Sequence, residues 1–335
     1  MRSIREVAKL ADVSPATVSR VMNGTANVSE DKRQRVLSAI AQTDFVPNEA
    51  ARTLFRRTSK TLGLIIPSIR NPFFTQFASV IDEVAKEHGY RLFLSNVDGD
   101  LEQERAALQK MVAATVDGVI LASTNDKIQE ELTNFPLPVI VVDARLSSDK
   151  VNAYIYCNYY KGGELAVKHL YEDCGCRNIV CIRGPQHIYT ARARYEGYRD
   201  YCQEHGIPEQ TVDCDYDFLA GMDMTRQLLE TYPEVDGILA CDDIVAISTY
   251  KVLYNMNRRV PDQIQLVGFD DIALSSLISP ELTTIRQPIE EMARTAAELI
   301  LKQTAPEKQG ECFIFPVSLV VRETTKRLEH KQADK

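Results

Sequence analysis

The chain has 335 residues and a formal net charge of −8 at pH 7, which is divided unevenly. Residues 1–60 carry a balance of +5 and the remainder −13, so a nucleic-acid contact confined to the N-terminal segment is expected. The length suffices for a small domain followed by a larger two-lobed one. No apolar run approaches the ~18–20 residues of a membrane span, and the N-terminus lacks the apolar core of a signal peptide. We therefore expect a cytoplasmic protein without membrane contact.

The cysteine pattern argues against disulfides and metal sites. None of the eight cysteines forms a CxxC pair, and several lie in strand-like apolar runs, such as Cys181 and Cys241. Buried free thiols in a reducing compartment explain them. Cys174 and Cys176 are spaced as a metal pair could be, but the five histidines show no ligand-like spacing. We expect no metal and no cofactor.

Residues 4–23 predict two short helices separated by a tight turn. The first helix takes its apolar face from residues at helical spacing: Ile4, Val7, Ala8 and Ala11. Ser14 is a suitable N-cap, and Pro15 follows at the first helical position. The outer face then carries the small Ala16 and, one turn later, Arg20. Such a face can approach base edges, and Arg20 can reach a guanine through two hydrogen bonds. An ordinary helical hairpin is the alternative.

A third amphipathic helix is expected over residues 29–42, and FVPNEAARTLFRR follows at 45–57. With VSPATVSRVMNG and VPNEAARTL, residues 3–56 resemble the N-terminal headpiece of the LacI/GalR family of bacterial transcription regulators. The resemblance implies a helix-turn-helix headpiece at 1–45 and a hinge helix and linker at 46–60. We expect base contacts from Pro15, Ala16, Arg20 and Leu54, the last as a minor-groove wedge. Phosphate contacts are expected from short polar side chains: Ser3, Thr17, Ser19, Asn23 and Asn48.

From residue 61 onward, short β-branched runs alternate with helical stretches. LGLIIP, RLFLSN, DGVILAS, PVIVVD, AYIYCN, NIVCIRG, DGILAC and IQLVGFD read as strands, and FTQFASVIDEVAKEHG and MTRQLLETYP as helices. Continuous apolar strands between helices are typical of parallel sheets covered on both faces. The predicted fold class is α/β, with a helix-turn-helix headpiece and a bilobal core of two doubly wound parallel sheets.

In such sheets, ligands bind beyond the carboxyl ends of the strands. The residues that follow the predicted strands there are Asn71, Phe73, Phe74, Asp143, Arg192, Asp242, Asp270 and Gln287. Carboxylates, amides and guanidinium groups pair with vicinal hydroxyls, and Phe rings stack on a sugar ring. Each aspartate could instead cap a helix, and either Arg192 or Arg194 could be a structural ion-pair partner. Asp243 and Asp271 adjoin two of the candidates, and alternation predicts that one residue of each pair faces the cleft.

Residues 61–322 resemble the LacI/GalR ligand-binding core, through NPFF at 71–74, RGP…TARARYEG at 183–197, LVGFDD at 266–271 and LTTIRQP at 282–288. The resemblance implies a core over 61–330, with an N-lobe at about 61–160 and 289–322 and a C-lobe at about 161–288. It adds Phe218 to the pocket and is strongest toward ribose-binding members. Those members follow the aspartate with arginine, whereas here Ala144 intervenes before Arg145. Fructose and sucrose therefore remain alternatives to ribose.

A DNA-binding repressor of a sugar catabolic operon, released by a small sugar, accounts for head, hinge and core together. A regulator that needs a corepressor stays open, as does a sugar-binding protein without DNA function. No GxSxG, Walker or HExxH motif is present, so an enzyme is not expected. The expected partners are double-stranded operator DNA, a sugar effector and a second copy of the chain, because the tail lacks the apolar heptads of a tetramer. A co-regulator protein is left open.

Overall fold

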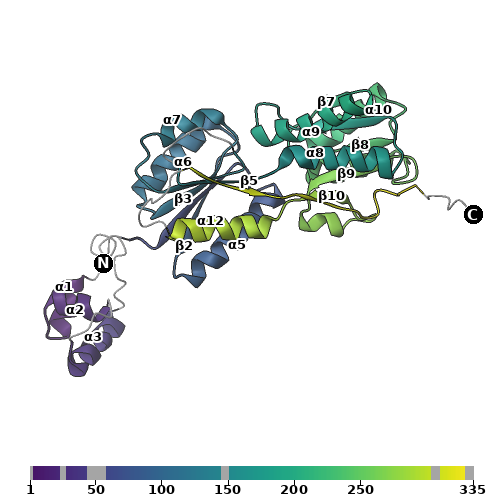
Figure 1. The fold of residues 1–335 in the computed structure, drawn as a ribbon. Helices are drawn as coiled ribbons and strands as arrows, with labels where there is room; N and C mark the ends of the chain where they lie inside the picture. Colours follow the sequence, from purple (N-terminus) through teal and green to yellow (C-terminus); the bar gives the residue numbers. More distant parts are fainter. Residues whose placement is uncertain (1–2, 23–27, 44–57, 145–150, 303–309, 329–335) are drawn as a thin grey trace, which may run out of the picture. The chain divides into compact units, whose positions relative to one another are not determined.

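The computed structural model describes residues 3–22, 28–43, 58–144, 151–302 and 310–328 and divides into two compact units, Met1–Ser59 and Lys60–Lys335 (Figure 1). The first unit holds three helices: α1 (Ile4–Leu10), α2 (Pro15–Met22) and α3 (Glu30–Thr43). Their small core is built from Val7, Ala8, Ala11, Val18, Val36 and Ala39. The expected hinge helix, with Leu54 and Asn48, lies outside the described residues, as does Asn23.

The first lobe of the second unit contains a six-stranded parallel sheet of order β11-β5-β4-β3-β1-β2. Its strands are β1 (Thr61–Ile66), β2 (Arg91–Asn96), β3 (Gly118–Ala122), β4 (Val139–Val142), β5 (Ala153–Cys157) and β11 (Glu311–Phe315). Helices α5 (Pro72–Glu87), α6 (Leu101–Ala113), α7 (Gln129–Leu132), α12 (Ile289–Lys302) and the 3-10 turn η1 (Asp126–Ile128) complete it. The central strands β3, β4 and β5 are buried throughout, as their apolar runs predict.

The second lobe contains a sheet of order β12-β10-β9-β8-β6-β7. Its strands are β6 (Ile179–Arg183), β7 (Gln210–Asp213), β8 (Gly237–Leu239), β9 (Gln265–Asp270), β10 (Thr283–Arg286) and β12 (Ser318–Val320). Its helices are α8 (Tyr159–Lys168), α9 (Tyr189–His205), α10 (Phe218–Thr231) and α11 (Asp243–Asn255), with a π-helical turn η2 (His169–Asp173) and a 3-10 turn η3 (Ala273–Ser276). All pairs are parallel except β12 with β10.

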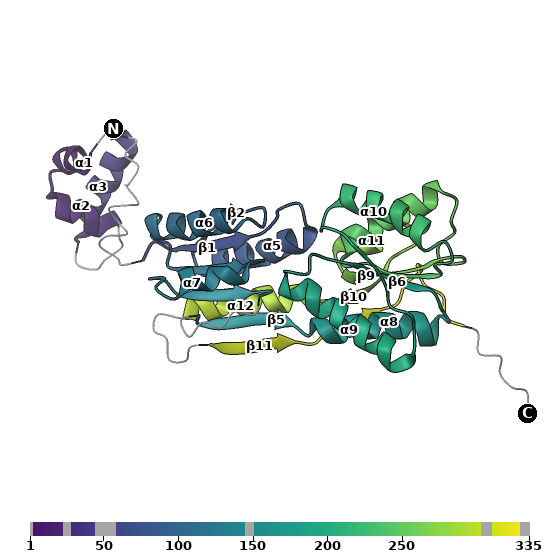
Figure 2. The ribbon, with the colours of Figure 1, turned by 90° about the horizontal axis from the view of Figure 1, so that it is seen from above.

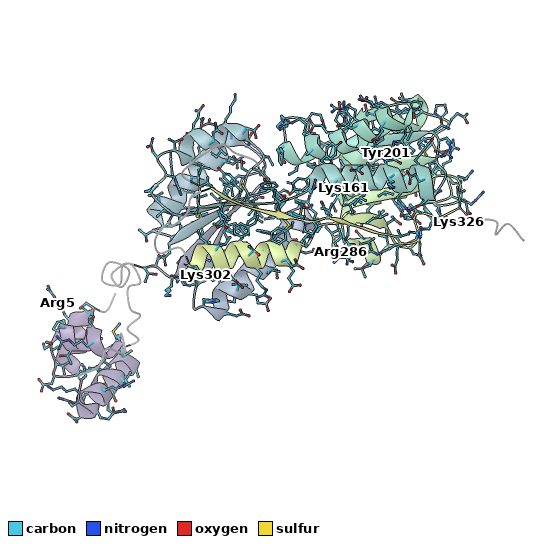
Figure 3. All side chains as sticks on the ribbon, viewed as in Figure 1. Arg5, Lys161, Tyr201, Arg286, Lys302 and Lys326 are labelled. Atoms are coloured by element: carbon cyan, nitrogen blue, oxygen red, sulfur yellow. The ribbon has the colours of Figure 1, made fainter. Side chains whose placement is uncertain are left out.

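The chain crosses between the lobes three times, after β5, after β10 and after β11. Figure 2 shows β11 beside β5 at the edge of the first lobe, and the yellow segment then continues to the second. Figure 3 labels Arg286 at the end of β10 and Lys302 at the end of α12. The second crossing and helix α12 lie between these two residues. The N-lobe is expected to end at residue 322, and this boundary is wrong for β12. After the break at Pro316, residues 318–320 pair with β10 and belong to the sheet of the second lobe. Among the described helices, none is long and apolar enough to cross a membrane.

Candidate functional site

A cavity of about 450 Å³ lies between the two lobes of the second unit. It is lined by residues at or beyond the carboxyl ends of β1, β2, β3 and β4 in the first lobe and of β6, β7, β8 and β9 in the second. This is the edge at which open α/β sheets bind ligands. The lining residues include Ser68, Arg70, Asn71, Phe73, Phe74, Asp98, Ser123, Thr124, Asp143, His187, Thr190, Arg194, Asp215, Tyr216, Asp217, Asp242 and Asp270.

Asp270 and Arg194 form a buried ion pair at the wall of this cavity. The Asp270 Oδ1 atom accepts hydrogen bonds from Arg194 Nη2 at 3.0 Å and from Gln287 Nε2 at 2.6 Å. Arg194 Nη1 also donates to the Cys241 carbonyl oxygen at 2.6 Å, and its guanidinium lies 3.9 Å from the Phe269 ring centroid. Within the described part of the chain, both side-chain hydrogen bonds to this carboxylate end on Oδ1, which leaves Oδ2 to accept from a ligand.

Asp242 caps α11 and also lines the cavity, so it is a helix cap and a candidate ligand-binding residue at the same time. Its Oδ1 atom accepts from the Val245 backbone N–H at 2.8 Å. Its Oδ2 atom accepts from Asn71 Nδ2 at 3.3 Å, a hydrogen bond between the two lobes. Asn71 in turn caps α5 through the Phe73 backbone N–H. The helix caps therefore fix both side chains at the cavity wall.

Asp143 directly follows β4 and lines the cavity. Its backbone adopts the left-handed conformation, with φ of 58°. Its Oδ1 atom accepts a hydrogen bond from the Tyr159 hydroxyl group, at the start of α8. Asp243 and Asp271 do not line the cavity. Asp243 is fully buried and accepts from Ser275 and Thr284, whereas Asp271 pairs with Arg286 and Arg322 outside it. One aspartate of each neighbouring pair therefore faces the cavity.

Burial raises the pKa of the cavity carboxyls. Burial raises the pKa of Asp143 to about 6. Burial, followed by repulsion from Asp270 as the second cause, raises the pKa of Asp242 to about 7. Burial also raises the pKa of Asp270, although Arg194 and Gln287 act in the opposite direction. Three carboxyls thus share the charge of one buried guanidinium. Such a site favours a neutral ligand rich in hydroxyl donors over an anion.

Aromatic rings enclose the apolar part of the cavity. Phe73 and Phe74 pack edge to face with ring centroids 5.0 Å apart, and both line the cavity. Tyr216, from the loop after β7, is the third ring, and its buried hydroxyl oxygen has no hydrogen-bond partner within the described part of the chain. Among the described residues, Arg194 Nε is likewise buried without a partner, as is Gln287 Oε1, which lies outside the cavity. A bound polyol can satisfy the unpaired atoms of Tyr216 and Arg194, which line the cavity.

Three of the expected pocket residues lie elsewhere. Arg192 is half-buried outside the cavity and donates to the Gln186 carbonyl oxygen at 3.1 Å, while Arg194 lines the cavity. Phe218 is 41% exposed at the start of α10, and Tyr216 lines the cavity in its place. Gln287 does not line the cavity but holds Asp270. Helical spacing identifies Arg194, because it is in phase with the buried residues Thr190, Gly197, Tyr198 and Tyr201.

In the first unit, the second helix presents the expected outer face. Pro15, Ala16 and Arg20 are exposed, Thr17 and Ser19 are half-buried, and Val18 between them is buried. Ser14 Oγ accepts from the Thr17 backbone N–H at 3.2 Å, as an N-cap does. Ser3 is exposed at the start of α1, and its backbone N–H donates to Glu6 Oε2 at 2.9 Å.

The described residues contain no group of three or more His, Cys, Asp or Glu side chains able to hold a metal ion. Seven cysteines are buried thiols, and Cys312 is exposed on the edge strand β11. The Cys174 thiol lies 3.4 Å from His169 Nε2, and Cys176 donates to the Asp236 carbonyl oxygen. These two cysteines therefore have separate partners.

The family model for bacterial regulatory proteins of the lacI family matches residues 3–48, and that of the periplasmic binding protein-like domain matches residues 167–325. A ribose operon repressor from Halalkalibacterium halodurans is 39% identical over 334 residues, covering 99% of both chains. A LacI transcriptional regulator from Alkaliphilus metalliredigens, solved with D-xylulofuranose, is 35% identical with a TM-score of 0.71, covering 80% of this chain and 99% of that one. The lac repressor dimer bound to operator is 28% identical with a TM-score of 0.83, covering 97% and 99%. The chain therefore belongs to the lacI family of bacterial regulatory proteins, a family of transcription regulators rather than enzymes.

Proposed function

We propose that this protein represses a sugar catabolic operon in the cytoplasm and that D-ribose releases it from its operator. The proposal rests on the cavity between the lobes, which is lined by three buried carboxyls and two Phe rings. The same chain also contains helix α2, the proposed DNA-reading helix. Ionised carboxylates accept hydrogen bonds from sugar hydroxyls, and charged hydrogen bonds are the strong ones.

The identity of the sugar rests on two arguments. The first is the excess of three cavity carboxyls over one guanidinium. Burial already opposes the ionised state of Asp143, Asp242 and Asp270, and a phosphate group would add further negative charge beside them, so phosphorylated sugars are disfavoured. The name of the Halalkalibacterium halodurans relative favours ribose, while the xylulofuranose complex of another relative keeps a second pentose in view. Ala144, which departs from the ribose pattern, is buried, and Arg145 lies outside the described residues.

For DNA recognition, the exposed side of the second helix enters the major groove. Arg20 reads a base, and Pro15 and Ala16 let the helix backbone approach the base edges. The short polar side chains contact phosphates: Ser3, Thr17, Ser19, Asn23 and Asn48. Leu54, in a hinge segment over residues 46–60, enters the minor groove. The exposed position of the three residues on α2 supports this assignment.

The functional assembly is a homodimer, because a near-palindromic operator presents two half-sites to two heads. Exposed apolar side chains supply the surface that such an interface needs. On the first lobe they include Phe93 and Leu94 of the edge strand β2, and on the second lobe Tyr254, Met256 and Leu277, of which Leu277 is 75% exposed. Charged substitutions such as Leu277→Asp should shift the protein toward monomer in sedimentation velocity and weaken operator binding.

The test of the function is a fluorescence anisotropy titration of full-length protein on a palindromic operator selected from a randomised library. D-ribose should raise the apparent Kd for this operator, and the same sugar should raise the melting temperature of the protein. Release by fructose, sucrose or D-xylulose alone would replace ribose with that sugar. Tighter DNA binding in the presence of the sugar would make the ligand a corepressor. Failure of wild-type protein to bind any DNA in the selection would refute the repressor function.

A further inference from the structure

Tyr159 occupies an unusual position between the cavity and the second lobe. It is the first residue of α8, directly after the crossing from β5, and only 1% of its surface is exposed. The Arg194 guanidinium lies 5.5 Å from its ring centroid, and the Tyr189 ring packs against it edge on at 6.2 Å. These neighbours hold the ring, so its hydroxyl group stays directed at Asp143 Oδ1.

We propose that Tyr159 is a positioning residue for the sugar site: its hydroxyl group holds the Asp143 carboxylate ionised and oriented toward the cavity. The inference rests on the proposed sugar-binding function and deepens it. Tyr159 occupies one oxygen of Asp143, which leaves the other oxygen to accept from the sugar. Because Asp143 ends a strand of the first lobe and Tyr159 begins a helix of the second, this hydrogen bond also joins sugar recognition to the crossing between the lobes.

The groups around Asp143 explain why one hydroxyl group matters. Burial and the nearby Asp270 charge oppose the ionised carboxylate, while Arg194 and the Tyr159 hydroxyl support it. The Cys157 thiol adjoins the same site with its pKa raised by burial, so it stays protonated and adds no charge. Removing the hydroxyl group therefore raises the pKa of Asp143. A hydrogen bond to a charged group is strong enough to move that pKa upward by about one unit or more.

The first experiment needs no sugar. The full-length protein carries ¹³Cγ-labelled aspartate, and the Asp143 resonance is assigned by its loss in Asp143→Asn. Tyr159→Phe should move the titration midpoint of Asp143 upward by about one unit. Tyr160→Phe is the matched control, because that neighbouring tyrosine donates to Asp200 outside the cavity and should leave the midpoint in place. An unchanged Asp143 midpoint in Tyr159→Phe overturns the proposal.

The second experiment measures D-ribose affinity by calorimetry from pH 5 to 8.5. The affinity of Tyr159→Phe should approach the wild-type value at pH 8.5 and fall on acidification with a midpoint shifted by the same amount as that of Asp143. In an Asp143→Asn background, the Tyr159→Phe effect on affinity should lose its pH dependence, whereas an effect that acts through another titrating group would keep it. A pH-independent loss in Tyr159→Phe contradicts the proposal. If the wild type ignores ribose, the sugar assignment fails, and the ligand-free titration still decides the role of Tyr159.

Discussion

Asp270→Asn separates recognition of the sugar from stability of the fold. The two hydrogen bonds that Asp270 accepts, from Arg194 and Gln287, both go to Oδ1. An asparagine carbonyl oxygen in that position keeps both donors, and its amide nitrogen then replaces Oδ2 at the cavity. A charged acceptor for sugar hydroxyls thereby becomes a neutral donor. Asn has nearly the same shape as Asp, so the φ of 119° at this residue is no greater an obstacle to the variant than to the wild type.

The expected loss of affinity follows from the bond that is removed. A hydrogen bond to a charged group contributes about 1.5–3 kcal/mol, so ribose affinity should fall about 10- to 150-fold. The loss of stability should stay below the about 3–5 kcal/mol of a broken buried ion pair, because Arg194 keeps its hydrogen bond and the nearby Asp143 compensates part of its charge. Burial raises the pKa of Asp270, so removing this charge also removes a desolvation cost.

The neighbouring Asp271→Asn is the matched control. Asp271 lies outside the cavity and binds Arg286 Nε at 2.5 Å and Arg322 Nη2 at 2.6 Å. The amide nitrogen of the new asparagine would face one of these two guanidinium nitrogens, which would lose its acceptor, so the protein should lose about 1–3 kcal/mol of stability and keep its ribose affinity. Calorimetry with D-ribose and thermal unfolding of both variants test this pair of expectations. Wild-type affinity in Asp270→Asn, or equal affinity losses in the two variants, would refute the reasoning.

Three further predictions concern other parts of the molecule. Tyr216→Phe removes a buried hydroxyl group that has no hydrogen-bond partner among the described residues, so it should raise the melting temperature slightly and weaken ribose binding about 3- to 10-fold by calorimetry. Unchanged affinity would exclude the hydroxyl group from the site. Arg20→Ala should cost about 1–3 kcal/mol of operator binding and relax specificity at one position per half-site, whereas an equal loss on random DNA would indicate a phosphate contact. Because the pKa of Asp143 is raised to about 6 and that of Asp242 to about 7, from 3.8, the folded protein binds more protons than the unfolded chain in this range. The melting temperature of the ligand-free protein should therefore fall as pH rises from 5 to 7, and Asp242→Asn should flatten that fall; a rise over the same range contradicts it.

Strands that are buried on both faces could be predicted from the sequence, as could the edge strand β2, whereas the edge strands β7 and β11 could not. β3, β4 and β5 are continuous apolar runs because helices cover both faces of their sheet. β7 and β11 lie at sheet edges, where one side of the strand has no neighbour; β7 is half-buried and has one apolar residue in four, and β11 is partly exposed. Phe218 was expected from the family resemblance, whereas Tyr216 lies in the loop after β7, a strand that the sequence pattern did not predict.

The candidate site followed from the sequence wherever a side chain directly ends a buried strand. Asp143 and Asp270 are such residues, and both line the cavity. Arg194 lies on helix α9, so the direction of its side chain depends on its position around the helix axis and not on the end of a strand. The expectation of Arg192 did not take this helical position into account. The Asp143–Tyr159 hydrogen bond joins residues 16 positions apart in different lobes, a proximity that only the crossing geometry creates.

The cavity and the DNA-reading head are joined through one strand. β1 begins directly after Lys60, the first residue of the second unit, and the residues beyond its carboxyl end, including Ser68 and Asn71, line the cavity. The Lys60 backbone N–H donates to Asp117 and its carbonyl oxygen accepts from Arg91, so the start of the strand is fixed to its neighbours. A ligand held by acceptors of both lobes binds best in one arrangement of these lobes, and its differential affinity sets how far it can shift them. β1 spans six residues, from directly after Lys60 to directly before the cavity residue Pro67, so this strand is the direct covalent connection between the cavity wall and the start of the second unit.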